Sequence, residues 1–515
     1  MGAQCAVASA TLRGVEALPV TVEVVISGGL PGMSMVGMPD AAVQEARERV
    51  RAAIRAAGFA MPNDKIVVNL APANLRKSGS GFDLPIAIGI LAATGQINHR
   101  ILEGRLFVGE LSLDGRVRAV SGALAFGICA ERTGLALVTA PGGAHIPLQT
   151  LEQKALANLG RLHLEDPFDE PDADEGSGVG DSAAAPDFRD IAGHEMAKRA
   201  FQIAAAGSHG LLMMGPPGSG KSMLAARLPS ILPPLDEDEM IEAAVVHSVA
   251  GEDVAPILAG RRPFRHPHHS ATTAGLVGGG NPLRPGEISL AHRGVLFLDE
   301  LAEFKSCALQ SLRQPMEAGR VCLTRADGNV TFPARFMLVA ASNPCPCGFY
   351  GDDEHACTCT LPQIRQYQGR IGGPLIDRID VQIDVRRLDP RGVLASGGGT
   401  DSAALREGVM RARAFASWRR AHEGAERDAA PGAQLSRTGG RSAAPRDVIA
   451  ACRLTDEGRE FLVSMADAHA MSGRALVSTL AVARTIADIG EREAVTVEHL
   501  AEALGFRLRE GVGGC

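Results

Sequence analysis

The sequence predicts an α/β protein in which two α/β domains are followed by a helical C-terminal domain. Strand and helix patterns alternate over residues 1–165 and again over 188–390, where apolar strands separated by helices are typical of a parallel sheet. Residues 447–515 carry only helical patterns. Residues 166–187 are acidic and then rich in Gly, Ser and Ala, which predicts a flexible linker. Residues 391–446, rich in Gly, Ala and Arg, are assigned as a second linker-like segment.

Local patterns predict the individual elements. An apolar run predicts a strand at Val20–Ile26, and the Gly-Gly-Leu-Pro-Gly after it predicts a turn. Asp40 is a typical N-cap residue, and apolar residues at helical spacing predict a helix from it to Ala57. The other expected elements are strands at 66–70 and 106–111 and a helix at 84–94, and then C-terminal helices at 446–451, 456–468, 475–489 and 497–510.

The overall composition indicates a globular protein without a membrane span. Of the 515 residues, 45% are hydrophobic and 22% are charged. No apolar run reaches about 18 residues, and the N-terminus lacks the basic and apolar stretches of a secretion signal. Ten mostly scattered cysteines fit a reducing compartment, so we expect a cytoplasmic location. The net charge of −7 gives no overall attraction to nucleic acid, so a DNA-binding surface needs locally concentrated basic residues.

The most specific motif is a phosphate-binding loop. It follows the apolar run Leu211–Met214 and precedes a helical pattern, which is the context that this motif requires. The glycines let backbone N–H groups close around phosphates, the lysine places a positive charge near the β- and γ-phosphates, and the final serine completes a Mg²⁺ shell. The predicted ATP- and Mg²⁺-binding residues are Gly215, Pro216, Pro217, Gly218, Ser219, Gly220, Lys221 and Ser222.

Two further segments predict the rest of a hydrolytic site. The apolar strand Val295–Leu298 ends in Asp299, which suits a position linked to Mg²⁺, and Glu300, which suits orienting the attacking water. A later strand, expected at Arg335–Ala341, delivers Asn343. An amide at this position can hold the water opposite Glu300, which is the sensor role in AAA+ ATPases.

Two arginines are candidates for contacting phosphate from a distance. Arg378 lies between two aspartates at the edge of a final strand, where an arginine finger acts on the γ-phosphate of the neighbouring subunit. The alternative for Arg378 is an ion pair with Asp377 or Asp380 in its own subunit. Arg474 opens a helix of the C-terminal domain and suits a second sensor, although Arg484 competes for that role.

The chain between the phosphate loop and the final strand holds two further features. Alternating residues flank Asp327-Gly328 and predict a hairpin over Val321–Phe332. In a ring such a hairpin lines the pore, and Arg325 near its tip would meet a DNA backbone; the alternative is a plain surface hairpin. The tract at 266–269 reads His-Pro-His-His and, with His292, admits a metal site, but its spacing is not helical and favours a loop that contacts DNA or a neighbouring subunit.

Four cysteines are clustered directly after Asn343. Cys345, Cys347, Cys357 and Cys359 form two Cys-x-Cys pairs that could close a tetrahedral zinc site. The fit is imperfect because Cys-x₂-Cys spacing is more usual. The alternatives are a redox-labile loop, or a site in which His355 replaces one thiolate.

These motifs, with longer segments of the chain, resemble the Mg-chelatase-like AAA+ ATPases of the ComM/YifB family nearly end to end. The resemblance rests on segments such as VEVVISGGLPGMSMVGMPDAAVQEARERVRAAI, VNLAPANLRKSGSGFDLPIAIGILAATGQI, GPPGSGKS, PHHSATTAGLVGGG, RPGEISLAHRGVLFLDELAEF and NPCPCGFYGD. It implies an N-terminal domain with the ribosomal protein S5 domain 2-like fold of Lon peptidases over 1–165. An AAA+ core at 188–390 and a helical lid at 447–515 follow. It also implies a homohexameric helicase that drives branch migration of recombination intermediates in natural transformation.

The Lon-like resemblance raises the question of peptidase activity, which needs a serine nucleophile and a lysine base. Ile86 stands at the serine position, and the lysine region holds Leu124. We therefore predict an ATPase that is not a peptidase. The lid also departs from the family, because Leu476 follows Arg474-Ala475 where a tyrosine is typical.

Three classes of function fit these observations. The leading hypothesis is a ring-forming, ATP-driven motor acting on branched or single-stranded DNA. A protein-remodelling ATPase is the alternative that the acidic net charge favours slightly. A magnesium-chelatase-type ATPase subunit fits the nucleotide domain, but nothing in the sequence suggests a tetrapyrrole site.

Overall fold

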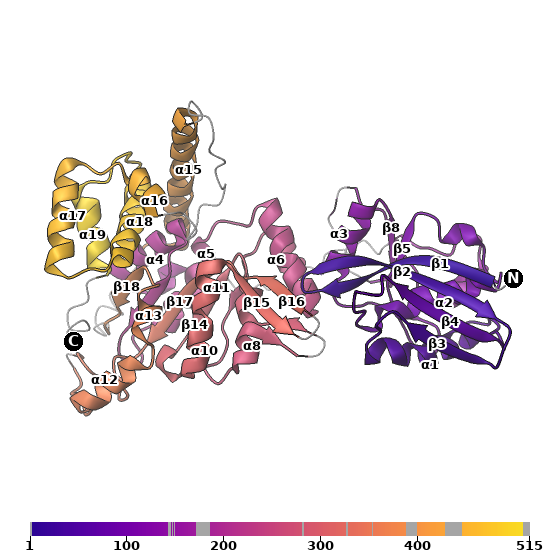
Figure 1. Ribbon diagram of the computed structural model, residues 1–515. Coiled ribbons are helices and arrows are strands. Elements are labelled where there is room, and N and C mark those ends of the chain that lie inside the picture. The colour runs from indigo at the N-terminus through magenta and orange to yellow at the C-terminus, as the bar shows by residue number, and fades with distance from the viewer. Residues whose placement is uncertain are drawn as a thin grey trace.

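The computed structural model describes residues 3–142, 146, 148, 150–170, 186–280, 283–325, 328–352, 354–387, 399–427 and 445–507. These residues form three bodies in chain order: an N-terminal α/β domain, a central domain built on a parallel sheet, and a C-terminal helical region (Figure 1). The central domain lies between the other two. Among the helices of the described ranges, none has the length and apolar character needed to cross a bilayer.

A seven-stranded mixed sheet forms the N-terminal domain. β1 (Ala3–Arg13) and β2 (Glu16–Ser27) pair antiparallel along their whole length, and the strand expected at 20–26 is the second part of β2. Every second residue of β2 from Val20 to Ile26 is buried, as one covered face of a sheet requires. The sheet order is β3-β4-β2-β1-β5-β8-β9, and its other strands are β3 (Gly32–Val36), β4 (Lys65–Ala71), β5 (Arg105–Phe107), β8 (Ala136–Thr139) and β9 (Gln153–Ala155).

Helices cover this sheet. α1 (Ala41–Ala56) begins where predicted, because the Asp40 side chain accepts a hydrogen bond from the backbone N–H of Val43 at 2.9 Å. α2 (Asp83–Ala93) is buried over almost its whole length, which accords with its continuous apolar sequence. The remaining elements are α3 (Ala123–Thr133), the 3₁₀ turns η1 (Ser80–Phe82), η2 (His99–Ile101) and η3 (Leu159–His163), and the small pair β6 (Glu110–Leu111) and β7 (Val117–Arg118).

The single strand expected at 106–111 is wrong, because the chain divides there into β5 and β6, which lie in different sheets. The break falls at Val108 and Gly109. The Gly109 N–H donates to the Gly81 carbonyl, and the Gly109 carbonyl accepts from Leu84, so its backbone pairs with the start of α2. The apolar run continues through the break because both pieces are buried, and hydrophobicity alone does not reveal a change of partner.

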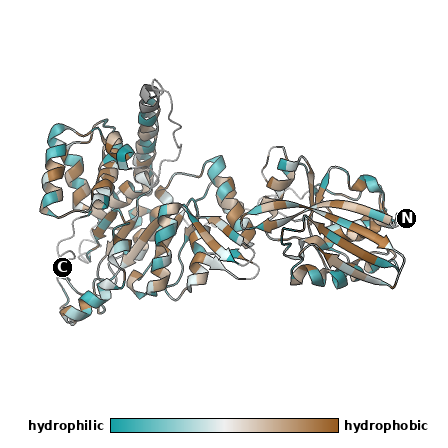
Figure 2. Cartoon of the chain, viewed as in Figure 1, coloured by the Kyte–Doolittle hydropathy of each residue, from teal (hydrophilic) through white to brown (hydrophobic). Residues whose placement is uncertain are grey.

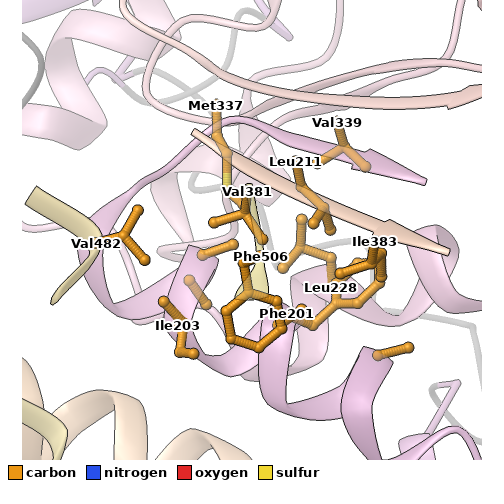
Figure 3. Close-up of a cluster of buried hydrophobic side chains, with 14 of the residues drawn as sticks. Phe201, Ile203, Leu211, Leu228, Met337, Val339, Val381, Ile383, Val482 and Phe506 are labelled. Atoms are coloured by element: carbon orange, nitrogen blue, oxygen red, sulfur yellow. The ribbon is translucent and has the colours of Figure 1, made fainter. Parts of the chain in front are cut away.

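The central domain is built on a five-stranded parallel sheet in the order β11-β14-β17-β10-β18. Its strands are β10 (Leu211–Met214), β11 (Phe264–Arg265), β14 (Val295–Leu298), β17 (Met337–Ser342) and β18 (Val381–Asp384). The three middle strands are buried along their full length, which explains why they appear in the sequence as continuous apolar runs. Helices cover both faces, and one side of the core is shown in Figure 3, where Phe201 and Leu228 pack against Leu211 and Val381.

The central domain also contains helices, 3₁₀ turns and two small strand pairs. The helices and turns are η4 (Phe188–Asp190), α4 (Glu195–Gly207), α5 (Lys221–Ile231), α6 (Glu237–Ala250), α7 (Ala255–Leu258), α8 (Thr273–Val277), α9 (Glu287–Leu290), η5 (Leu301–Glu303), α10 (Ser306–Ser311), α11 (Arg313–Ala318), α12 (Leu361–Gly369) and α13 (Gly373–Ile376). Two small antiparallel pairs are β12 (Gly278–Gly279) with β13 (Arg284–Pro285) and β15 (Arg320–Arg325) with β16 (Gly328–Pro333).

The second pair is the predicted hairpin, with one shift in its turn. Arg325 pairs with Gly328, so Gly328 belongs to β16 and not to the turn at which the sequence analysis placed it. Residues 326 and 327 lie outside the described ranges. Val321 and Phe332 are buried at the base of the hairpin, which fixes it to the central domain.

The segment 391–446, assigned from sequence as a linker, contains a long helix. α15 (Ser402–Arg427) projects from the body in Figure 1. Leu405, Val409 and Ala412 lie on one face at helical spacing and are buried, with Leu405 and Val409 in the core of the central domain. The Ala- and Arg-rich composition that suggested a linker is a good helix-forming composition. Residues 391–398 and 428–444 of that segment lie outside the described ranges.

The C-terminal region contains the four predicted helices: α16 (Pro445–Cys452), α17 (Asp456–Ala468), α18 (Gly473–Ile489) and α19 (Val497–Gly505). The bounds of α17 are those predicted, and α19 ends five residues earlier than expected. α18 packs against α4 and α15, and Val482 and Phe506 reach the core drawn in Figure 3. In Figure 2 the sheets are largely hydrophobic, whereas α17 at the periphery presents hydrophilic residues.

The N-terminal domain also contacts the central domain directly. Leu124, Ala125 and neighbouring side chains of α3 form one apolar cluster with Val245 and Val249 of α6. Backbone bonds reinforce this contact, since the Gly122 N–H donates to the Ser248 carbonyl at 2.7 Å. The tip of the β1–β2 pair reaches the hairpin β15–β16, where Arg13 donates to the Asn329 carbonyl.

The expected flexible linker at 166–187 is shorter than its composition suggested. Asp169 pairs through its backbone with Ala155, and Phe168 packs on the N-terminal core. At the other end Asp187 caps η4. Residues 171–185 lie outside the described ranges.

Candidate active site

The phosphate-binding loop joins β10 to α5 at the carboxyl edge of the central sheet. Glycine is required at three of its positions. A side chain on Gly215 would lie 2.1 Å from the Val385 carbonyl oxygen, and Gly218 and Gly220 have φ angles of 77° and 88°. The loop therefore presents its backbone to whatever binds there, at the N-terminus of α5, where anions are favoured.

Lys221 lies inside this loop. Its Nζ donates to the carbonyl oxygens of Gly215 and Pro216, each at 2.8 Å, and lies 3.3 Å from Oδ1 of Asn343. Burial lowers the pKa of this ammonium, and nearby Asp299 opposes that shift. Lys221 and Asn343 therefore meet at one point although 122 residues separate them, because β10 and β17 are parallel neighbours.

The carboxylates after β14 meet the same loop. Ser222 Oγ donates to Asp299 Oδ2 at 2.5 Å, so the two predicted Mg²⁺-linked side chains are already in contact. Glu300 has a φ angle of 50°, which is uncommon for a side chain of this size and is typical of strain held at functional positions. The predicted residues Lys221, Ser222, Asp299 and Asn343 form one cluster, with Glu300 beside it.

His269 contacts Glu300, which sequence reasoning did not anticipate. Its Nδ1 lies 3.2 Å from Glu300 Oε2, and its ring lies 4.1 Å from that of His268. The histidine tract was considered for metal binding or as a contact loop. In the structure His266 packs on Phe297. Within the described ranges, these histidines belong to no cluster of side chains arranged to hold a metal ion. A histidine at this distance can hold and orient the Glu300 carboxylate.

His292, the last histidine considered, belongs to the scaffold. It is buried and its Nδ1 accepts from the Arg335 N–H, so its proton lies on Nε2, which is 3.2 Å from Glu242. Burial lowers the pKa of His292. The hydrogen bond from His292, together with Arg293, lowers the pKa of Glu242 to about 2.

The four cysteines converge directly beside the phosphate loop. Sγ of Cys345 lies 3.3 Å from that of Cys347 and 3.7 Å from that of Cys357, and all four Sγ atoms, including that of Cys359, lie within 4.8 Å of one another. Four sulfurs about 2.3 Å from a tetrahedral zinc are about 3.8 Å apart, whereas a disulfide needs about 2.05 Å. The donor set therefore fits Zn²⁺. His355 is not part of it, since its ring packs on Phe349 and its Nδ1 lies 3.4 Å from Arg387.

Backbone donors prepare one of these thiols for metal binding. N–H groups of Phe349 and Thr358 lower the pKa of the Cys347 thiol, whereas hydrogen bonds with the neighbouring thiols raise the pKa of Cys357 and Cys359. Gly348, between the first cysteine pair and Phe349, lies against the phosphate loop. A side chain there would come within 2.5 Å of Cδ of Pro217.

Arg387 is a second residue that the sequence analysis missed. Its Nη2 donates to the Pro217 carbonyl at 2.9 Å, its Nε lies 3.8 Å from Asp352, and its guanidinium lies 5.5 Å from the Phe349 ring. Arg387 therefore joins the phosphate loop to the cysteine segment 345–359. It follows β18, the edge strand next to β10, and only the sheet order reveals its proximity.

Arg378 and Arg474 do not lie with this cluster. Arg378 precedes β18 by three residues, and β18 runs parallel to β10 with Val381 level with Leu211. The phosphate loop follows the other end of β10, so a four-residue strand of about 13 Å separates the two positions. Both arginines contact Glu317 Oε1, Arg378 at 2.6 Å and Arg474 at 2.8 Å. This carboxylate partner of Arg378 is one that the sequence analysis did not consider.

Arg484, the competitor for the sensor role, is a buried scaffold residue. It pairs with Asp488 at 3.0 Å and donates to the backbone carbonyl of Glu493 at 2.6 Å. Arg325 is exposed on the hairpin, and its Nη2 donates to the Gly280 carbonyl at 2.8 Å. In the N-terminal domain Ile86 and Leu124, which the sequence analysis compared with the dyad of a Lon-type peptidase, are buried in α2 and α3.

Comparison with known proteins identifies the family. Family models for magnesium chelatase match three parts of the chain: "Subunit ChlI of Mg-chelatase" at 22–143, "Magnesium chelatase, subunit ChlI" at 187–393, and "Magnesium chelatase, subunit ChlI C-terminal" at 399–507. The YifB protein of Salmonella typhimurium is 40% identical over 506 residues, 96% of this chain and 95% of that protein. The competence protein ComM of Haemophilus influenzae is 41% identical over 511 residues, with the same coverage.

The chain belongs to the Mg-chelatase-like YifB/ComM family. The predicted resemblance is thereby confirmed. The central domain of this YifB/ComM protein is an AAA-type ATPase domain, which implies ATP and Mg²⁺ at the phosphate loop. The N-terminal domain with its mixed sheet is the ChlI domain of the family, and the helical region is its C-terminal part.

Proposed function

We propose that this YifB/ComM protein is a ring-forming, ATP-driven DNA motor. It would assemble as a homohexamer and drive branch migration on branched or single-stranded recombination intermediates. The observation that carries the proposal is that Arg378 and the residues around the phosphate loop lie at opposite ends of the parallel strands of one sheet. A site divided in this way is complete only when a second copy supplies its arginine.

Each residue of the cluster has a role in this proposal. Lys221 binds the β- and γ-phosphates, Ser222 and Asp299 hold Mg²⁺, and Glu300 with Asn343 orients the attacking water. Arg378 of the adjoining copy stabilises charge on the transferred phosphoryl group. Arg474 shares its partner with Arg378, and so its sensor role would also be exercised on the adjoining copy.

DNA is assigned to the hairpin β15–β16. Arg325 is exposed there, and a ring would place six such hairpins around a central pore, where guanidinium groups attract the phosphate backbone. The relative named for competence supports a role in natural transformation. We further assign the N-terminal domain to the S5 domain 2-like type as a scaffold without peptidase activity, and Zn²⁺ to the four cysteines as a structural ion beside the phosphate loop.

The test is ATP hydrolysis by the full chain with branched, single-stranded or duplex DNA, with Lys221→Ala as the blank. Stimulation by branched DNA, absent from the blank, is the expected result. Hydrolysis that no DNA changes would overturn the proposal.

A protein-remodelling ATPase is the second candidate, favoured by the net charge of −7. DNA binding that weakens steeply with salt separates the two, because counterion release accompanies phosphate contacts. A magnesium-chelatase-type role follows only from the descriptions of the matching models. ATP hydrolysis that depends on a porphyrin would support it.

A further inference from the structure

One carboxylate oxygen holds both distant arginines. Glu317 Oε1 accepts from Nη2 of Arg378 at 2.6 Å and from Nη1 of Arg474 at 2.8 Å. Arg378 also donates through Nη1 to the Pro374 carbonyl at 2.6 Å, which orients its guanidinium. The hydrogen bonds from Arg474 and Arg378 lower the pKa of Glu317, so the carboxylate is charged at neutral pH.

The three residues come from three different segments, two in the central domain and one in the C-terminal region. Glu317 lies in the last turn of α11, Arg378 lies between α13 and β18, and Arg474 opens α18 in the C-terminal region. Both guanidinium groups bind a single carboxylate oxygen, while Asp377 and Asp380 face the neighbouring Arg507. An anion that replaces Glu317 must therefore offer the two arginines more than this shared oxygen does. The side chains of Glu317 and Arg474 are 47% and 46% exposed, so a second molecule can reach them, whereas that of Arg378 is 17% exposed and meets this surface through its Nη atoms.

A triphosphate bound to the phosphate loop of the same chain cannot be that anion, because the length of β10 separates this loop from the two arginines. A triphosphate bound to an adjoining copy can supply it. A phosphoryl group has more charge and more acceptor oxygens than a carboxylate, and guanidinium groups bind it through parallel hydrogen bonds. It can therefore accept both arginines at once in place of Glu317.

We propose that Glu317 is a positioning residue that holds Arg378 and Arg474 as one unit until the triphosphate on the adjoining copy replaces it. This inference rests on the proposed function, in which Arg378 acts on the neighbouring copy. It adds the group that keeps both arginines aligned between rounds of hydrolysis.

Glu317 also lies close in sequence to the hairpin β15–β16. Gly319 ends α11 with a φ angle of 64°, and β15 begins at the next residue. When phosphate takes the arginines, α11 loses its two ionic contacts at the base of β15. Nucleotide bound on one copy would thus be sensed by the hairpin of the next.

The test is a kcat and KM comparison for ATP hydrolysis without DNA, at protein concentrations that saturate assembly. Glu317→Gln is expected to lower kcat about tenfold, because each freed arginine must be ordered again in the transition state. Removing Glu317 also removes a competitor of phosphate for the two arginines. Because an ion pair this exposed is weak, the resulting gain in kcat is smaller than the tenfold loss. KM should stay within about twofold, since ATP is bound by the phosphate loop of its own copy. Glu317→Asp restores a carboxylate and should recover most of the loss.

Glu502→Gln is the matched control. Glu502 joins the C-terminal region to the central domain through Arg199 at 2.8 Å, and both side chains are 32% exposed. Glu502→Gln therefore breaks a comparable ion pair between the central domain and the C-terminal region, at a distance from Arg378 and Arg474. Its kcat should equal that of the wild type.

Four results have distinct meanings. A tenfold lower kcat for Glu317→Gln alone, with recovery by Glu317→Asp, supports the inference. Wild-type kcat for Glu317→Gln, beside an inactive Arg378→Ala, overturns it and leaves the proposed function intact. Equal losses for Glu317→Gln and Glu502→Gln overturn it as well, because the loss then reflects docking of the helical region. Full activity of Arg378→Ala overturns both the trans-acting arginine and this inference.

Discussion

Replacing Gly348 with alanine tests whether the cysteine segment positions the phosphate loop. The new Cβ would lie 2.5 Å from Cδ and 2.7 Å from Cγ of Pro217, whereas ordinary contacts begin near 3.4 Å. The proline ring cannot rotate away, so loop and cysteine segment must separate by about 1 Å. A displacement of that size in a phosphate-positioning element lowers turnover by up to about 100-fold.

The backbone offers a matched control for this substitution. Gly348 has a φ angle of 87°, so alanine there also carries a conformational cost of about 1–2 kcal/mol. Gly351, three residues later, has a φ angle of 78°, and a Cβ at this position would have no atom within 4 Å. Gly351→Ala therefore carries the same conformational cost without the contact with Pro217.

The assay is steady-state ATP hydrolysis of both variants, with thermal unfolding measured in parallel. We expect kcat/KM of Gly348→Ala to fall between about tenfold and 100-fold, while Gly351→Ala stays within about threefold of the wild type. Equal activity of the two variants would refute the reasoning, because the contact with Pro217 would then have no influence on the nucleotide site.

Further predictions concern catalysis, metal and pH. Glu300→Gln should bind a fluorescent ATP analogue with wild-type affinity and release no phosphate, because only orientation of the water is lost. Arg378→Ala mixed with Lys221→Ala should regain hydrolysis that neither shows alone, as measured by phosphate release. Purified protein should carry close to one zinc per chain by elemental analysis, and Cys345→Ser should lower that content. Glu242 has its pKa lowered from 4.5 to about 2. Its carboxylate therefore stabilises the fold above pH 4.5 and loses this effect as the pH falls toward 2. Glu242→Gln should lower Tm at neutral pH, by a margin that shrinks below pH 4.5.

Each of these has a contrary outcome. Weak nucleotide binding by Glu300→Gln would place this side chain in binding instead of catalysis. Mixed subunits that stay inactive would argue against an arginine acting between copies. Zinc content below about one fifth per chain, from protein kept reduced, would leave the cysteines as a thiol cluster. A Tm difference that does not depend on pH would mean that Glu242 stabilises the fold by something other than its charge.

The predictable part of the site consists of residues close together in sequence. Lys221 and Ser222 follow their glycines directly, and Asp299 and Glu300 follow their strand, so local pattern and chemistry identify them together. Asn343 could be predicted because a sensor residue directly follows a strand that neighbours the one ending in Asp299 and Glu300. Asp40 and α17 were placed well for the same reason, since caps and amphipathic faces are local signals.

The missed residues act across long stretches of chain. Arg387 lies 170 residues from Pro217, and Glu317 lies 157 residues from Arg474, so sheet order and packing alone bring them together. α15 was missed for a different reason. Its buried Leu405 and Val409 have helical spacing, but the Gly- and Ala-rich composition around them is equally typical of a linker.

The apolar contact between α3 and α6 bears on how the protein can be divided for experiment. Val245 and Val249 are each 7% exposed in the full chain because the N-terminal domain covers them. A fragment that begins at residue 187 retains α6 and leaves this face open to water. The ATPase part expressed on its own is then expected to self-associate through a surface that is internal in the intact molecule, and its apparent oligomeric state would not report on the ring.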